Sequence, residues 1–204
     1  MRRVFATFVL CFGAAATHAA PVQQASPASW WAFPAAPIFV TGDTWQLGSE
    51  TYRLYGVQAC LRSTYFTNAH GIKHDCGEVS LGMLVSYVRT LKPLCTTIAH
   101  TPSTHETFVV CVASLTAGPN KGSRLDLGTA LIAGGWAFAA LAANGEPFHT
   151  AYGAAQNVAQ NAHAGLWQFT DIPNPNATIL NALRRAHIVT ATKLASPHAA
   201  PPAH

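Results

Sequence analysis

The sequence predicts an α+β domain in which a small β-barrel is combined with helices. Three runs rich in β-branched and aromatic residues come first, and an amphipathic run of helical period follows them. Two more strand-like runs and two more helical patterns complete the order, which fits a barrel with helical additions. With 204 residues, half of them hydrophobic, the chain suits one globular domain with extensions.

Five runs are expected to form the strands, with Gly48-Ser49 as a hairpin turn between the second and the third. They cover residues 38–40, 44–47, 51–57, 94–98 and 107–113. Residues 60–75, between the third strand and the first helix, are polar and carry no such pattern. We expect this segment to be long and irregular.

The helices are predicted from capping residues and apolar spacing. The first is expected to start after Asp75, an N-cap residue, with Glu78 as its capping-box partner, and to end before Pro93. Leucines and valines recur between these limits at helical spacing. Three further helices are expected: one from Asp126 to Gly134, one over about 147–164, and a short one over 178–187.

The N-terminus has the pattern of a secretory signal peptide over residues 1–19. Arg2 and Arg3 precede an apolar run that small residues follow, and cleavage after Ala19 keeps Pro21 from the first mature position. A retained membrane anchor is the alternative, but the apolar run is too short to span a bilayer. We expect an exported protein, periplasmic or secreted, with no membrane span once the signal is removed.

The rest of the chain divides into three parts. Residues 20–36 contain several prolines and predict an exposed lead-in, from which Trp30 and Trp31 dock on the domain because they are too apolar for solvent. Residues 37–170 hold the predicted barrel and helices. Residues 171–204 form a C-terminal extension that is expected to be partly disordered.

The charge of the chain argues weakly against strong nucleic-acid binding. Only 10% of the residues are charged, and the formal net charge of +4 falls to +2 without the two arginines of the leader. A protein that neutralises phosphates usually carries a basic stripe, whereas the adjacent pair Arg184-Arg185 is the only sign of one here. The charge therefore does not support nucleic acid as a partner, although it does not exclude it. A protein or a glycan is also a possible partner.

Four cysteines remain after the leader, namely Cys60, Cys76, Cys95 and Cys111. An even number in an exported chain favours disulfides, and the lack of a Cys-x-x-Cys spacing disfavours the alternative of zinc. Three connectivities are possible. Cys95 and Cys111 lie on neighbouring predicted strands, close enough for a bridge if the register allows it.

Four stretches of the sequence, in their order and spacing, resemble the staphylococcal-nuclease-like (thermonuclease) family. They are Gly42-Asp43-Thr44, Tyr52-Arg53-Leu54-Tyr55-Gly56-Val57, Asp126-Leu127-Gly128 with Gly135-Trp136-Ala137, and Gly165-Leu166-Trp167. The resemblance covers about residues 37–170 and implies a five-stranded OB-type barrel with three helices. The chain resembles the exported bacterial members in particular. Such members tend to have a Cys-Gly at the start of the first helix, like Cys76-Gly77 here, and cysteines in the next two strands.

The family hydrolyses phosphodiester bonds with a calcium ion and a water nucleophile. This chemistry needs hard oxygen ligands, a carboxylate that acts on the water, and cations on the phosphate oxygens. By resemblance, Asp43 falls on a calcium carboxylate and Arg53 on the first phosphate-binding arginine. These two residues are the candidate site.

The other positions of the family site have changed. The second calcium carboxylate falls on Gln58, the general base on Leu61 and the second phosphate-binding arginine on Thr107. One lost charge at such a site costs on the order of 10²–10³ in rate, and a carboxylate plus an amide is a poor calcium cage. We therefore expect a catalytically degenerate domain that acts as a binding or assembly module. A divergent calcium-dependent nuclease of DNA or RNA is the alternative.

Several residues near this site have a second interpretation. The insert that contains His70, His74, Asp75 and Cys76 has the residues for a replacement metal site or a histidine base, but a solvated loop is favoured, with the aspartate as a cap and the cysteine in a disulfide. Glu106 either substitutes for a missing carboxylate or, as we favour, is an exposed turn residue. Asp43 and Arg53 are equally well explained as a turn cap and its ion-pair partner.

Overall fold

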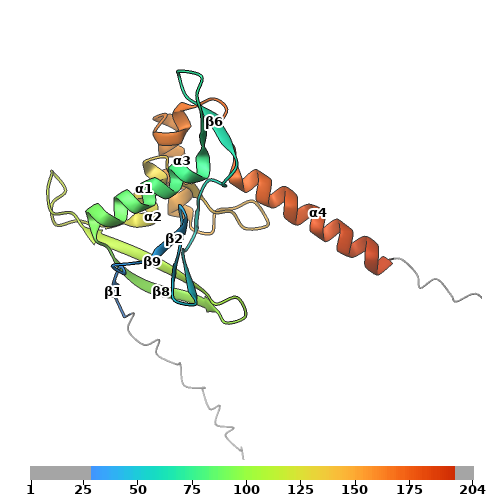
Figure 1. Ribbon diagram of the computed structural model, residues 1–204, viewed down its shortest axis with the longest axis horizontal. Coiled ribbons are helices and arrows are strands. Elements are labelled where there is room, and N and C mark those ends of the chain that lie inside the picture. The colour runs from blue at the N-terminus through green and yellow to red at the C-terminus, as the bar shows by residue number, and fades with distance from the viewer. Residues whose placement is uncertain (1–28, 196–204) are drawn as a thin grey trace, which may run out of the picture.

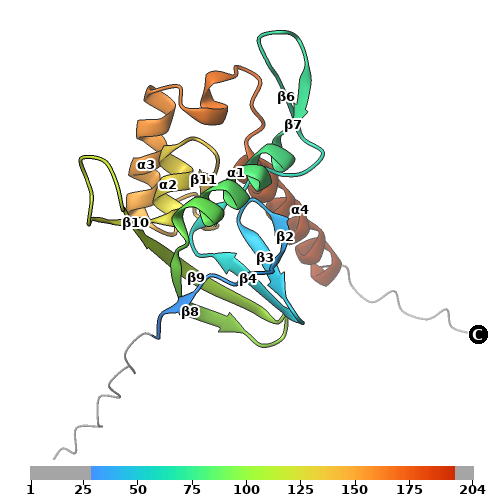
Figure 2. The ribbon, with the colours of Figure 1, turned by 60° about the vertical axis from the view of Figure 1, so that its left-hand side comes forward.

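A computed structural model describes residues 29–195 of the protein, and the side chains as far as residue 186. The predicted signal peptide, the first residues of the lead-in and the tail from residue 196 lie outside this range. The described chain has a mixed α+β fold, in which a curled sheet is covered on one side by three helices while a fourth helix projects from the body (Figures 1 and 2).

The main sheet has seven strands rather than the five expected. Its order is β1-β8-β9-β4-β3-β2, and β10 pairs with β9 off this path. The strands are β1 (Trp31–Ala32), β2 (Ile38–Thr41), β3 (Thr44–Leu47), β4 (Glu50–Leu54), β8 (Leu94–Thr101), β9 (Glu106–Ser114) and β10 (Arg124–Asp126). All pairs are antiparallel except β4 with β9, so the sheet curls around this parallel contact. The two additional strands, β1 and β10, are short and lie outside the runs that the alternation pattern identified.

The third expected strand is divided in two at Gly56. This glycine has a φ of +71°, a conformation that other residues rarely adopt, and the chain turns there after β4. The next strand, β5 (Val57–Gln58), leaves the main sheet and pairs with β11 (Phe138–Ala139). The turn brings Gln58 back beside Arg53 of β4, which matters for the candidate site.

The segment expected to be irregular is a β-hairpin of β6 (Tyr65–Thr67) and β7 (Lys73–Asp75). Its turn is built on Asn68, whose side-chain oxygen accepts hydrogen bonds from the backbone N–H groups of His70 and Ile72. The hairpin extends away from the sheet in both ribbon views (Figures 1 and 2). Its strands are too short and too polar to show an alternating pattern in the sequence.

Four α-helices are present in the described chain, where the resemblance implied three. They are α1 (Cys76–Leu91), α2 (Leu127–Ala133), α3 (Thr150–Asn161) and α4 (Pro175–Ala195), and a short 3₁₀-helix, η1 (Gly165–Gln168), follows α3. The fourth is much longer than the short helix expected over 178–187. None of the helices in residues 29–195 is long and apolar enough to cross a membrane.

The predicted N-caps of the first two helices are confirmed. Asp75 Oδ1 accepts a hydrogen bond from the N–H of Glu78 at 3.1 Å, and Asp126 Oδ1 accepts one from the N–H of Thr129 at 2.6 Å. The Glu78 carboxylate lies 3.8 Å from Nη1 of Arg62. In a full capping box the Glu78 side chain would accept a hydrogen bond from the N–H of Asp75. Here it forms an exposed ion pair with Arg62 instead.

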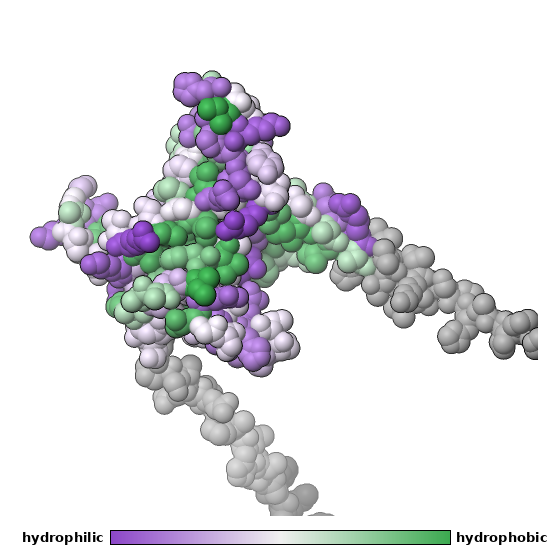
Figure 3. Space-filling model, in the orientation of Figure 1, coloured by the Kyte–Doolittle hydropathy of each residue, from purple (hydrophilic) through white to green (hydrophobic). Residues whose placement is uncertain are grey.

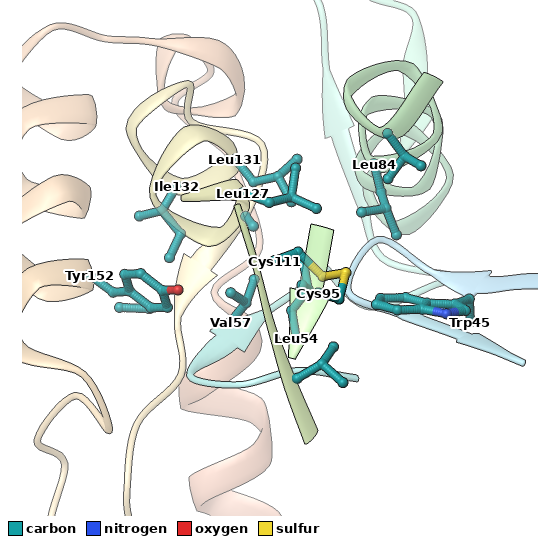
Figure 4. Close-up of a cluster of buried hydrophobic side chains, with 14 residues drawn as sticks. Trp45, Leu54, Val57, Leu84, Cys95, Cys111, Leu127, Leu131, Ile132 and Tyr152 are labelled. Atoms are coloured by element: carbon teal, nitrogen blue, oxygen red, sulfur yellow. A yellow bond between two sulfur atoms is a disulfide. The ribbon is translucent and has the colours of Figure 1, made fainter. Parts of the chain in front are cut away.

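The core lies between the curled sheet and the helices α1, α2 and α3 (Figure 4). The fully buried indole of Trp45 lies at one end of it, and Leu127, Leu131 and Ile132 of α2 lie at the other. Tyr152 of α3 donates a hydrogen bond of 2.8 Å to Asp126 at the start of α2. Burial, with the nearby carboxylate as a second cause, raises the pKa of this tyrosine far above its ordinary value.

The lead-in docks on the sheet, as predicted from its tryptophans. Trp31 lies in β1 against the edge strand β8, and its ring contacts Tyr52 edge-on at 5.6 Å. Phe33 follows and packs against Trp45 at 4.6 Å. Trp30 is more exposed and lies over the guanidinium of Arg124. The lead-in is therefore part of the fold from Trp31 onward.

The expectation of disulfides over zinc is confirmed for all four cysteines. Cys95 and Cys111 are directly opposite each other on β8 and β9 and form one bridge. Cys60 and Cys76 form the other, which joins the chain after β5 to the start of α1. The second bridge closes the base of the β6–β7 hairpin and so fixes where the hairpin leaves the body.

Candidate functional site

Asp43 lies in the turn between β2 and β3 and is 2% exposed. Its carboxylate accepts hydrogen bonds from the hydroxyls of Thr41 and Thr44 and, at 3.1 Å, from the backbone N–H of Ala59. Oδ2 also lies 3.3 Å from Nη2 of Arg53. Both carboxylate oxygens are therefore engaged, and Asp43 ties the β2–β3 turn, β4 and the chain after β5 together.

The glycine before Asp43 is required by packing. A Cβ on Gly42 would lie 2.3 Å from Oγ of Ser80 in α1, so a side chain has no room there. Ser80 is itself fixed, because its hydroxyl donates to the backbone oxygen of Trp136 at 2.7 Å. Packing against Ser80 thus explains the glycine of the Gly-Asp-Thr corner, and hydrogen bonding within the chain explains its aspartate.

Arg53 lies on β4 and points to the face of the sheet opposite the core residue Leu54. Its Nη2 donates to Oε1 of Gln58 at 2.9 Å, and its Nη1 lies 4.0 Å from Oε1 of Glu106. The side chain is 31% exposed. Within residues 29–195 its Nε–H has no hydrogen-bond acceptor, so part of the guanidinium can still donate to a ligand.

Four of the predicted site residues line one cavity of about 400 Å³. They are Asp43, Arg53, Gln58 and Leu61. Gln58 is 7% exposed, and both ends of its amide are used, since Nε2 donates to the backbone oxygen of Ala59 at 2.8 Å. Arg62 adds a second cation to the lining. These four positions lie together, and their roles by resemblance stay a prediction.

The fifth predicted residue, Thr107, is elsewhere. It is 7% exposed and its hydroxyl contacts Nδ1 of His100 at 2.9 Å, in a separate cavity beside Trp31 and Tyr52. Side chains alternate between the faces of a strand, and β9 pairs with β4 so that Phe108 is opposite Arg53. Thr107 therefore points to the other face, and its assignment as the lost phosphate clamp was one residue out of register.

The residue of β9 that meets Arg53 is Glu106. It begins the strand, its side chain is 28% exposed, and it lies at ion-pair distance from the guanidinium. The expectation of an exposed turn residue was therefore wrong. The strand start was missed because the β8–β9 connection is only four residues long, Pro102 to His105, and its polar character continues into the first residues of β9.

The histidine insert does not reach this site. His74 stacks on Phe66 at 5.6 Å and contacts the Asn68 amide at 2.9 Å, both within the hairpin. Asp75 caps α1 and also accepts from the N–H of Ser63 at 2.8 Å. Cys76 is in its disulfide, so the expected cap and disulfide are present, whereas the expected loop is a β-hairpin. In the described part of the chain, no three His, Cys, Asp or Glu side chains are grouped so that they could hold a metal ion.

A second cavity, of about 500 Å³, adjoins the first and was missed from the sequence. The two cavities share the residues Arg53, Gln58 and Ile179. The second is lined mainly by apolar side chains from β4 and β5, β9, the chain after β11, and α4. The larger ones include Tyr55, Phe108, Leu141, Phe148, Ile179, Leu180 and Leu183. We call the two cavities together the Arg53 cleft.

The helix α4 forms the outer wall of the cleft. Asn176 in its first turn is 7% exposed and donates to the backbone oxygen of Ala139 at 2.9 Å, while Asn174 caps the helix through the N–H of Ala177 at 3.2 Å. After this anchored turn α4 leaves the body, and hydrophobic surface extends from the body onto its first turns (Figure 3). The spacing of Ile179, Leu180 and Leu183 is the sequence signal that could have indicated an apolar helix face here.

No protein-family model and no curated protein matches the sequence. The resemblance to the staphylococcal-nuclease-like family rests on the four motifs and stays a prediction.

Proposed function

We propose that the protein is an exported binding domain of staphylococcal-nuclease-like, OB-type fold, and that its ligand occupies the Arg53 cleft without being hydrolysed. The observation that carries this proposal is that both carboxylate oxygens of Asp43 are occupied by groups of the protein itself. A carboxylate that takes three hydrogen bonds and an ion pair from its own chain acts as a structural group. The adjoining apolar cavity, in contrast, is open for a ligand.

The residues around Asp43 do not fit a calcium ion. Calcium takes six to eight oxygen ligands, several of them carboxylates. In this cleft the second family carboxylate is Gln58, whose oxygen already accepts from Arg53, and the third position is the hydrocarbon side chain of Leu61. Glu106 is held at the opposite side of the guanidinium. We therefore assign no step to a calcium ion.

Among the described residues, none that lines the cleft is an imidazole or a free carboxylate that could act as a catalytic base. The position that the family uses is Leu61, which cannot accept a proton. His70 and His74 are in the hairpin, and His100 contacts Thr107 on the other face of the sheet.

The two disulfides support export, because such bridges persist in oxidising compartments.

One observation favours the second candidate, a divergent nuclease. Asp43 and Glu106 lie on either side of Arg53, so two carboxylates and a cation do occur together. The arrangement lacks a free carboxylate oxygen on Asp43, which is why we place this candidate second.

Cleavage assays separate the two candidates. We expect the mature protein to leave single-stranded DNA and RNA intact in both Ca²⁺ and EDTA. Metal-dependent cleavage that disappears in Arg53→Lys, but persists in the charge-matched control Arg185→Lys on the exposed face of α4, would overturn the proposal in favour of the nuclease.

Access to the cleft is tested with the dye 8-anilinonaphthalene-1-sulfonate, whose fluorescence rises on apolar surface. The folded protein should bind it, and Leu180→Ser should weaken the binding because this side chain lines the cavity. Asn181→Ser, one position along the same helix and exposed, is the control. Equal dye binding by both variants would contradict a ligand site under α4.

A further inference from the structure

We propose that the ligand of the Arg53 cleft is an amphipathic anion, with one anionic head on the Arg53 guanidinium and an unbranched apolar chain in the cavity under α4. This inference rests on the proposed function and adds the chemical class of the ligand. It follows from three features of the cleft: the charge of its polar half, the few free hydrogen-bonding groups, and the lining of its apolar half.

The polar half of the cleft has a positive lining. Two arginines, Arg53 and Arg62, and one carboxylate, Asp43, contribute to it. The carboxylate is 2% exposed and faces three donors besides Arg53, so its charge is directed into the protein. Arg62 is 47% exposed and contacts the backbone oxygen of Val40 and the Glu78 carboxylate. Arg53 also lies 4.0 Å from Glu106. Neither glutamate lines the cavity, so an anionic head inside this half meets two guanidinium groups and one buried carboxylate.

Few side-chain groups of the cleft are left to bind a polar ligand. The amide of Gln58 is used by Arg53 and by the backbone of Ala59, and the Asn176 amide donates to the backbone of Ala139. Among the described residues, the unused donors include the Nε–H of Arg53, part of the guanidinium of Arg62 and the hydroxyl of Tyr55, and a guanidinium donor suits a carboxylate or a phosphate. A ligand with many hydroxyl or ring nitrogen groups would lose hydrogen bonds to water that these side chains cannot replace.

The apolar half of the cleft indicates that the rest of the ligand is an apolar chain. Its volume of about 500 Å³ lies in the usual range for small-molecule pockets, about 300–1,000 Å³. Two of its side chains, Phe148 at 56% and Leu183 at 48%, are unusually exposed for their size. Both line the cavity, so an apolar chain bound in it would remove part of each side chain from water.

Calorimetric titration of the full mature chain with single-chain amphiphiles, below their micelle concentrations, tests the proposal. Dodecanoate and dodecyl phosphate present the two sources of an anionic head, and dodecanol and dodecylammonium are the neutral and cationic controls. We expect one anion to bind per protein, at least tenfold tighter than the alcohol. Each methylene removed, from dodecanoate to decanoate to octanoate, should weaken binding about fourfold.

Variants locate the head and the chain. Arg53→Gln should remove the preference for the anion over the alcohol, and Arg53→Lys, which keeps the cation beside buried Asp43, should reduce it. Arg185→Gln removes the same charge from α4 outside the cleft and should leave the preference unchanged. Leu180→Ser should weaken the anion and the alcohol alike, whereas Asn181→Ser should change neither. Melting curves of each variant show that it is folded.

The outcomes separate this inference from the function beneath it. No binding of either anion, equal binding of the anion and the alcohol, or an anion preference that survives Arg53→Gln would each overturn the inference. If the dye still bound under α4 in that case, the binding function would stand with a different ligand. Metal-dependent cleavage of nucleic acid would overturn both.

Discussion

The two halves of the Arg53 cleft differ in how completely the protein satisfies its own groups. In the polar half, Asp43, Gln58 and the turn around them form a closed set of hydrogen bonds. In the apolar half, side chains as large as Phe148 and Leu183 stay half in solvent around a cavity of about 500 Å³. The residues most like a catalytic site hold the fold together, and the open cavity, where we propose that a ligand binds, lies beside them.

The largest effect is expected for Asp43→Ala. The change removes the acceptor for three hydrogen bonds and leaves the partly buried Arg53 without its closest anion, which should lower the free energy of unfolding by about 3–5 kcal/mol. Urea denaturation of the mature protein measures it. Asp171→Ala, which removes an exposed carboxylate that accepts a hydrogen bond from the N–H of Thr67, is the control and should cost much less. A loss below about 0.5 kcal/mol would mean that Asp43 is free for another role and would end the distinction between the halves.

The next effect concerns the disulfide at the base of the hairpin. Replacing Cys60 and Cys76 by serine removes a link across 16 residues, which should cost about 3 kcal/mol. The polar half should also loosen, because Cys60 and Leu61 line it. Hydrogen exchange at residues 60–76 measures this, and the apolar half should keep its dye binding. Loss of dye binding in the folded variant would show that the two halves are not independent.

A moderate and pH-dependent effect is expected for Tyr152→Phe. The hydroxyl donates to partly buried Asp126, so its removal should cost about 1–3 kcal/mol at neutral pH. The folded protein raises the pKa of this tyrosine, so its contribution is complete below the unfolded pKa near 10 and is lost as pH rises above it. Wild type should therefore lose stability above about pH 10 more steeply than the variant. Parallel slopes would contradict the raised pKa.

The smallest stability effect, with a clear effect on binding, is expected for Leu183→Ser. The side chain is 48% exposed, so the free energy of unfolding should change by less than about 0.5 kcal/mol. Binding of dodecanoate should nonetheless weaken severalfold, because the residue lines the cavity. Thr107→Val, on the other face of the sheet, should leave dodecanoate binding unchanged. An effect of Thr107→Val on binding would challenge the assignment of faces.

Local signals predicted the parts of the fold that depend on neighbours in the sequence. Asp75 and Asp126 cap helices where the capping pattern placed them, and the strands found by alternation are present. These caps and strands depend on residues within a few positions of one another. Asp43, Arg53, Gln58 and Leu61, the positions named by the resemblance, line one cavity, which also includes Ile179 of α4.

The errors arise where distant segments meet. The face that Thr107 presents is decided by its pairing with β4, some fifty residues away, and a shift of one residue moves a side chain to the other face. The apolar cavity needs β4, β9 and α4 together, so no single window of sequence contains it. The hairpin of β6 and β7 is held by the disulfide that joins its two ends and by the Asn68 turn, which alternation does not detect.

The two disulfides have a consequence for the order in which the chain assembles. Each joins cysteines 16 positions apart, and both lie between residues 60 and 111. The parallel pairing of β4 with β9 spans a much longer loop, which costs more chain entropy to close. In a chain that enters an oxidising compartment N-terminus first, both bridges can form before α2, α3 and α4 have arrived. Both disulfides would then be formed before α4, the outer wall of the cleft, has entered the compartment.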